Sequence, residues 1–227
     1  MWALSQMALA RLAMSKIYGL KFYKLFGTGS GHGFTNIVNP LNNSGVYAIL
    51  AVWENQRMAK KALETEGIYK RYKNKAEQNW NIFLKPVSVR GLWSGKSPFE
   101  VKNNSSVKDQ QIVALTRASI KISNLLKFWK RVPDIENVIG SDKNVLFKIG
   151  MGEIPWFHQV TFSIWPNIDT MNNFARENGP HAAAIDAVRK ENWFAEELYA
   201  RFQIIDQIGS WTEVTPISKI STQKEVL

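Results

Sequence analysis

An internal repeat constrains the fold of this chain more than any other feature. The segment VYAILAVWEN at 46–55 resembles HQVTFSIWPN at 158–167, and both place Trp-x-Asn before a segment with helical spacing. Two further matches follow in the same order: Asn79-Trp80 with Asn192-Trp193, and Gly91-Leu92-Trp93-Ser94 with Gly209-Ser210-Trp211-Thr212. Ordered matches of this kind indicate two copies of one supersecondary unit.

Each copy reads as strand–helix–strand–strand–helix–strand, the ferredoxin-like order. The second copy has all four strands, whereas the first starts at a helix, with no strand-forming residues before Trp2. We therefore expect an α+β protein in which two ferredoxin-like halves, related by an approximate twofold axis, form an α+β barrel. This is the dimeric α+β barrel type fused in one chain, with the first half lacking its N-terminal strand.

The expected boundaries follow from composition. The first half covers 1–95 and the second 111–215, and the polar, turn-rich stretch 96–110 connects them. Residues 216–227 form a polar tail that we expect to fray. A chain of 227 residues is long enough to bury a sizeable core.

Apolar spacing locates the individual elements. Strands are expected over 20–26, 46–53, 80–91, 111–120, 145–150, 158–165 and about 198–211, and helices over 2–15, 55–66, 69–78 and 122–131. Pro86 lies inside one of these strands, which predicts an edge strand or a bulge there. The first helix is expected to bury the face that carries Leu4, Met7, Ala8, Arg11 and Leu12.

Composition narrows the function. Cysteine is absent, which excludes disulfides, thiolate metal sites and a cysteine nucleophile. No apolar run approaches the roughly 20 residues of a membrane span. The net charge of +10 favours an anionic partner surface, although for any one lysine or arginine a solvated helix face is the favoured interpretation. No recognised nucleic-acid-binding motif is present, so nucleic acid is not expected as a partner.

His181 is the most informative single residue. Pro180 suits the first position of a helix, so His181 falls in the first turn, on the face shared by Ile185 and Val188. The helix N-terminus keeps the imidazole neutral, the form that binds metal. Such a histidine is typical of a haem site. The alternative is a core histidine bonded to a carbonyl, and spacing alone favours it. The first half has Tyr69 here, so the fold does not require histidine.

The other two histidines give weaker signals. His158 lies on a strand face with Val160 and Phe162, where it would be a distal pocket residue, a second ligand or a half-buried strand histidine. His32 lies in the loop GTGSGHG, which would cap a pocket or serve only as a flexible strand end. That loop is not a dinucleotide fingerprint, because no helix opens directly after it.

Several longer motifs together resemble the spheroidene monooxygenase family. They are WALSQMALAR, FYKLFGTGSGHGF, VYAILAVW, FLKPVSVRGLWSG, IVALTRASIK, FWKRVP and GEIPWFHQVTFSIWP, and the resemblance runs from Trp2 to about Trp211. Members of this family act in bacterial carotenoid synthesis. They begin with a strand before the WALSQM helix, so this chain looks short at its N-terminus: either that strand lies upstream of Met1 in a longer natural form, or the sheet lacks it.

The resemblance implies an oxygen-dependent enzyme that introduces a keto group into a linear carotenoid. It implies a haem cofactor, with iron bound by His181, and an external electron donor such as a ferredoxin. His158 is the expected catalytic residue. Arg117 and Arg201 are the expected partners of the haem propionates, because guanidinium pairs bidentately with carboxylate.

The expected location is cytoplasmic, with peripheral membrane contact through the basic surface, since carotenoids reside in membranes. Two alternatives stay open at this point. One is a cofactor-free monooxygenase on the same barrel. The other is a non-catalytic module that binds an apolar ligand.

Overall fold

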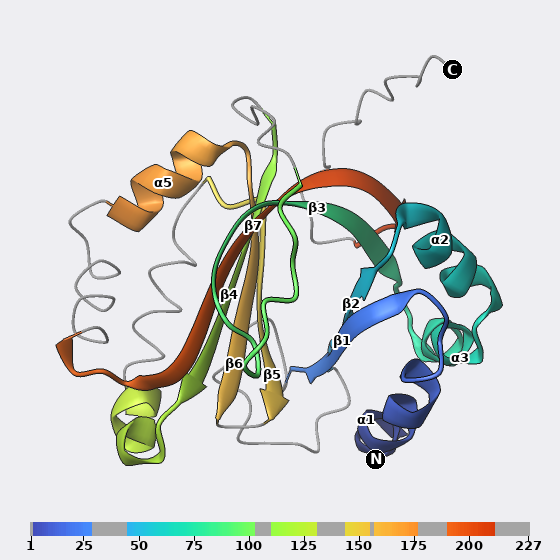
Figure 1. Ribbon diagram of the computed structural model, residues 1–227, viewed down its shortest axis with the longest axis horizontal. Helices are drawn as coiled ribbons and strands as arrows, with labels where there is room; N and C mark the ends of the chain where they lie inside the picture. The colour runs from blue at the N-terminus through green and yellow to red at the C-terminus, as the bar shows by residue number, and fades with distance from the viewer. Residues whose placement is uncertain are drawn as a thin grey trace.

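A curled antiparallel sheet with helices on its outer side forms the body of the protein, as a computed structural model shows (Figure 1). The structure describes residues 2–28, 45–102, 110–130, 144–154, 157–176 and 190–211. The strands are β1 Leu20–Gly27, β2 Tyr47–Trp53, β3 Trp80–Gly91, β4 Ile112–Ile120, β5 Phe147–Ile154, β6 His158–Trp165 and β7 Phe194–Gly209. The helices are α1 Trp2–Met14, α2 Gln56–Thr65, α3 Gly67–Lys75 and α5 Ile168–Arg176, with a 3-10 turn at Ile122–Asn124 that runs into helical residues 125–130.

The order of the strands reveals the two halves. The sheet runs β2-β1-β5-β6-β4-β7-β3, and its β5-β6-β4-β7 part has the ferredoxin-like order. β1 pairs with β5 and β3 pairs with β7, so each junction joins strands that occupy equivalent places in the two halves. A twofold relation between the halves produces this arrangement. The predicted α+β fold is confirmed, and among the described residues the first half contributes three strands and the second four.

The repeat also fixes local structure. Trp53 and Trp165 end equivalent strands, and the asparagine two residues later caps the following helix in each half. The Asn55 side chain accepts a hydrogen bond from the backbone N–H of Met58 at 3.0 Å, and Asn167 accepts one from Thr170 at 2.9 Å. Short polar side chains stabilise helix starts in this way, which explains why the two Trp-x-Asn motifs match.

The main core lies on the inner, concave face of the sheet. Strand side chains alternate between faces, so every second residue of each strand enters this core. It contains Phe26, Trp93, Phe99, Val113, Leu115, Ile149, Met151, Val160, Ile164, Leu198, Ala200, Phe202 and Ile204. On the outer face, α1 and α3 cover β1 and β2, and α5 packs through Met171 against Trp165 and Ile112. Figure 1 shows α5 on one side of the curled sheet and α1 to α3 on the other.

Side chains connect the two ends of the sheet, β2 and β3. Helix α2, which follows β2, reaches Asp206 on β7 through Gln56 (3.1 Å) and Lys60 (2.6 Å). The Lys60 ammonium also lies 5.6 Å from the centre of the Phe83 ring on β3. Among the described residues, no strand lies between β2 and β3, so each has one paired edge.

Two expectations about these elements have clear outcomes. β3 is a terminal strand with a register shift between Pro86 and Ser88, so the prediction from Pro86 is confirmed. The predicted buried face of α1 is wrong, because Leu12 is 69% exposed while Ala10 and Met14 are fully buried. The apolar residues of α1 lie on all sides of the helix, and spacing alone therefore does not decide which side faces the core.

Candidate functional site

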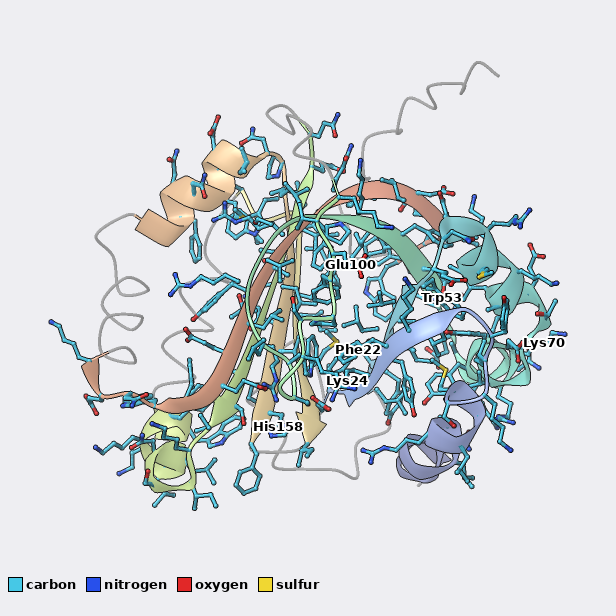
Figure 2. All side chains as sticks on the ribbon, viewed as in Figure 1. Phe22, Lys24, Trp53, Lys70, Glu100 and His158 are labelled. Atoms are coloured by element: carbon cyan, nitrogen blue, oxygen red, sulfur yellow. The ribbon has the colours of Figure 1, made fainter. Side chains whose placement is uncertain are left out.

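Five ionisable side chains meet on the inner face of the sheet, near one end of the core. Lys24, Arg117, Glu153, His158 and Glu196 come from five different strands, and Figure 2 labels Lys24 and His158 at this end. Each occupies an inward-facing position of its strand. We call these five residues the inner charge cluster.

Glu153 holds one side of the inner charge cluster. Its carboxylate pairs with the Lys24 ammonium and accepts a hydrogen bond from the indole N–H of Trp93 at 3.0 Å. Nδ1 of His158 lies 3.9 Å from Oε2 of the same carboxylate. The Glu153 side chain is 11% exposed, so these contacts replace most of the water that an ionised carboxylate needs.

Arg117 and Glu196 hold the other side. Arg117 is 1% exposed, and its Nη1 donates to Oε1 of Glu196. Glu196 also accepts the backbone N–H groups of Ser94 and Gly95, each at 2.7 Å. Ser94 and Gly95 have φ values of 53° and 73°, a turn whose adjacent N–H groups point at one anion. Nε of Arg117 is buried and has no hydrogen-bond partner among the described residues.

Trp93 joins the two sides. It is fully buried, and both cations lie against its ring, with Lys24 Nζ 5.9 Å and Arg117 Cζ 5.8 Å from the ring centre. Cations over an indole face are attracted by its negative face. Phe22 and Phe26 pack on the same ring system at centroid distances of 5.7 Å and 5.9 Å.

Burial and charge set the protonation states in the inner charge cluster. Burial lowers the pKa of His158 below its ordinary value, and the positive charge of Arg117 lowers it further, although Glu153 opposes this. For Glu196, burial would raise the pKa, but the hydrogen bonds from Gly95 and Ser94 and the charge of Arg117 outweigh it and lower the pKa. The cluster therefore contains a neutral His158 imidazole and an ionised Glu196 carboxylate at neutral pH.

The structure brings two of the predicted site residues together and separates a third. His158 and Arg117 share the inner charge cluster. Arg201 pairs across the sheet with Ala114, whose side chain packs on the outer face, so Arg201 lies on that outer face. His181 and His32 lie outside the described residues.

Sequence reasoning missed the other members of the cluster, Lys24, Glu153 and Glu196, and Trp93 beside them. A signal existed, since each charged residue stands at an inward position of an otherwise apolar strand face. The repeat also marked Trp93. Among the described residues, no group of three or more His, Cys, Asp or Glu side chains is placed to hold a metal ion.

Comparison with known proteins decides the family. The chain is 46% identical over 226 residues to the spheroidene monooxygenase of Cereibacter sphaeroides, covering 99% of this chain and 68% of that protein. It is 44% identical to the spheroidene monooxygenase of Rhodobacter capsulatus, covering 99% of this chain and 92% of that protein. The chain belongs to the spheroidene monooxygenase family. The resemblance seen in the sequence motifs is thereby confirmed, and so is the expectation of an oxygen-using enzyme.

Other comparisons address the fold. An aldoxime dehydratase structure aligns with a TM-score of 0.52 at 8% identity, covering 92% of this chain and 80% of that one. A likeness at this identity supports the shared fold alone. No protein-family model matches the chain. Within the described residues, we find no helix long and apolar enough to cross a bilayer.

Proposed function

We propose that this protein is a monooxygenase that introduces a keto group into a linear carotenoid of the spheroidene type. The observation that carries the proposal is the similarity to two spheroidene monooxygenases over 99% of the chain. Molecular oxygen is the second substrate. Two hydroxylations at one carbon, followed by loss of water, give the ketone.

The proposal includes haem as cofactor, and the donor set of the chain permits a test of its fit. Haem needs one axial nitrogen for iron and cationic partners for its propionates. His181 supplies the nitrogen in this proposal. Arg201, a cation on the outer face of the sheet, supplies the partner for a propionate in this proposal. The donor types therefore fit.

Arg117 and His158 fit the cofactor less well than Arg201. The guanidinium of Arg117 is already paired with Glu196 and stacked on Trp93, on the inner face. His158 is held on the same inner face, with Nδ1 towards Glu153. In this proposal, Arg117 holds the other members of the inner charge cluster in position. His158, neutral and beside the Glu153 carboxylate, is the proton acceptor in this proposal, and Glu153 stabilises the protonated imidazole.

When bound, haem would supply the activation of O₂ with electrons from an external donor protein such as a ferredoxin. The chain itself orients substrate, excludes water and handles protons. The same proposal places the protein in the cytoplasm, in peripheral contact with the membrane that holds its substrate.

Replacement of His181 tests the cofactor. Wild type, His181→Ala, Arg201→Gln and His158→Gln would be purified from one haem-sufficient host and compared by absorption spectrum. His181→Ala should lose haem or change its ligation, Arg201→Gln should hold haem more weakly, and His158→Gln should keep the wild-type spectrum with lower turnover. A wild type without haem that still oxygenates carotenoid would replace this proposal with the cofactor-free alternative. An unchanged His181→Ala spectrum would refute the ligand assignment.

A further inference from the structure

Helix α1 exposes two leucines to solvent. Leu9 is 57% and Leu12 69% exposed, while the smaller Ala10 and the flexible Met14 are fully buried. A surface helix ordinarily turns its leucines inward. Leaving two leucines on the outer face costs stability unless something else covers them.

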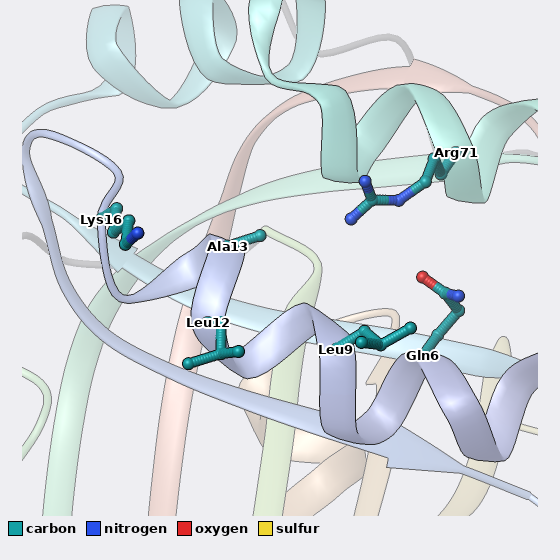
Figure 3. Close-up of a pocket in the computed structure, with 6 residues that line it drawn as sticks. All are labelled: Gln6, Leu9, Leu12, Ala13, Lys16 and Arg71. Atoms are coloured by element: carbon teal, nitrogen blue, oxygen red, sulfur yellow. The ribbon is translucent and has the colours of Figure 1, made fainter.

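A groove of about 410 Å³ lies where α1 faces α3 (Figure 3). Leu9, Leu12 and Ala13 form its apolar lining, and Gln6, Lys16 and Arg71 supply its polar groups. Gln6 is 7% exposed, and its Oε1 has no hydrogen-bond partner among the described residues. Lys16 and Arg71 are exposed, and neither has an acidic partner within the described part of the chain. Figure 3 shows the Arg71 and Gln6 side chains pointing towards each other across the groove.

The equivalent element of the second half repeats this pattern. Residues 122–130, like α1, lie between the first and second strand positions of their half. Ile122 and Leu126 are each 80% exposed, and Lys127 and Lys130 are exposed beside them. In Figure 1, α1 and this yellow-green segment lie along the same lower edge of the molecule. The repeat therefore presents two apolar and basic elements on one edge.

Charge identifies the partner that this edge fits. Neither 2–21 nor 120–130 contains a single aspartate or glutamate, and together they carry Arg11, Lys16, Lys21, Lys121, Lys127 and Lys130. Glu191, which pairs with Lys127 at 3.5 Å, comes from outside these two segments and leaves the other cations in excess. Exposed aliphatic side chains among an excess of cations are typical of helices that lie in the interface of an anionic bilayer. A surface that binds another protein would be expected to carry both acidic and basic side chains.

We propose that α1 and residues 122–130 dock the protein on an anionic lipid bilayer, and that the groove between α1 and α3 receives one phospholipid. Lys16 and Arg71 contact the headgroup phosphate, and Leu9 and Leu12 contact the acyl region. The inference deepens the proposed function and rests on it for the reason to visit a membrane, since a carotenoid resides there. We call α1 and residues 122–130 together the docking edge.

Vesicle flotation of the full chain tests this assignment. Vesicles of phosphatidylglycerol and phosphatidylcholine in equal parts are compared with phosphatidylcholine alone. Wild type should float with the anionic vesicles, and the Leu9→Gln/Leu12→Gln variant should need at least about tenfold more lipid for half-maximal binding. The control Ile208→Gln changes a 45% exposed aliphatic side chain near the end of β7 and should bind like wild type.

A second variant tests the cations. Lys16→Gln/Arg71→Gln should bind anionic vesicles several-fold less tightly, and the difference should shrink as salt is raised because surface charge is screened. Glycerol phosphate in free solution should not displace wild type from vesicles, since it lacks acyl chains. Displacement at millimolar glycerol phosphate would replace the lipid with a free phosphate ligand.

Turnover separates this inference from the proposed function. With carotenoid in detergent micelles, Leu9→Gln/Leu12→Gln should match wild type, whereas with carotenoid in vesicles it should be slower. If wild type floats but does not oxygenate carotenoid in micelles or in vesicles, the docking edge is supported and the proposed function is refuted. Equal flotation of wild type and the leucine variant, or none by wild type, overturns the docking edge. Dimerisation in sedimentation velocity, lost in the leucine variant and without flotation, would assign the edge to a second copy instead.

Discussion

Arg117 is the side chain whose environment is hardest to maintain. A guanidinium that is 1% exposed is stable only while its charge is compensated, and Glu196 compensates it while accepting two backbone N–H groups. Breaking a buried ion pair from one side leaves the other charge desolvated and unpaired. We predict that Glu196→Gln lowers the free energy of unfolding by roughly 2–4 kcal/mol in urea titrations.

A surface pair provides the matched comparison. Lys127 lies 3.5 Å from Glu191, and both side chains are largely exposed. Exposed pairs of this kind contribute little to stability, so Lys127→Gln should change the free energy of unfolding by less than about 0.5 kcal/mol. Equal effects of Glu196→Gln and Lys127→Gln would contradict the role assigned to the inner charge cluster.

His158 should make stability depend on pH. Its pKa in the folded protein is lowered from 6.5 by burial and by Arg117, so the unfolded chain binds a proton at higher pH than the folded one. The contribution of His158 to the free energy of unfolding is therefore fully present above about pH 6.5. It is lost as the pH falls below that value towards the folded pKa. Chemical denaturation at pH 7.5 and 5.5 should show a smaller loss for His158→Gln than for wild type. A loss of equal size in both proteins would count against a buried neutral imidazole.

At the scale of elements, two glycines end equivalent strands and cannot be replaced. Gly91 has φ +93°, and a Cβ there would lie 2.1 Å from the carbonyl oxygen of Glu197; Gly209 has φ +82° and a Cβ 2.0 Å from the carbonyl of Asn79. We predict that Gly91→Ala and Gly209→Ala each cost roughly 2 kcal/mol or more, measured by thermal or urea unfolding. The clash adds to the strain of positive φ.

Two other glycines separate these causes. Gly95 has φ +73° but open space around its Cβ, so Gly95→Ala should cost only about 1–2 kcal/mol, the strain of a left-handed backbone. Gly67 starts α3 with no atom within 4 Å of a Cβ and without positive φ, so Gly67→Ala should be neutral or stabilising by about 0.5 kcal/mol. A destabilised Gly67→Ala would show that contacts absent here govern the first turn of α3.

The elements themselves could be predicted from sequence because their signals are local. Alternation located the strands, the two Trp-x-Asn motifs located helix starts, and Pro86 marked a terminal strand. The inner charge cluster gave a weaker signal, single charged residues within apolar strands. Lys24 in FYKLF reads as a residue facing solvent, and its partner Glu153 is 129 residues away in sequence, so only the pairing of β1 with β5 brings them together. The exposed face of α1 was misjudged for a related reason, since the sequence does not show what covers it.

At the scale of the whole molecule, the sheet should differ in stability from its centre to its ends. β4 is bonded on both sides, to β6 and β7, whereas β2 pairs only with β1 among the described strands. Local opening is cheapest at such terminal strands. We predict that amides of β4 exchange with deuterium more slowly than those of β2 by roughly two orders of magnitude or more, measured by mass spectrometry. Equal rates would indicate that β2 is covered by another chain or segment.

The contact of Gln56 and Lys60 with Asp206 has a mechanical consequence. In a fully hydrogen-bonded ring of strands, the number of strands and their stagger determine the diameter of the lumen. Here the described strands form an open ring. Side chains, rather than backbone hydrogen bonds, connect its two ends. One carboxylate and its two polar partners therefore join α2 to β7 where no backbone hydrogen bonds join β2 to β3 among the described residues. Weakening that contact would let the two ends of the sheet separate more readily without altering any residue of the core.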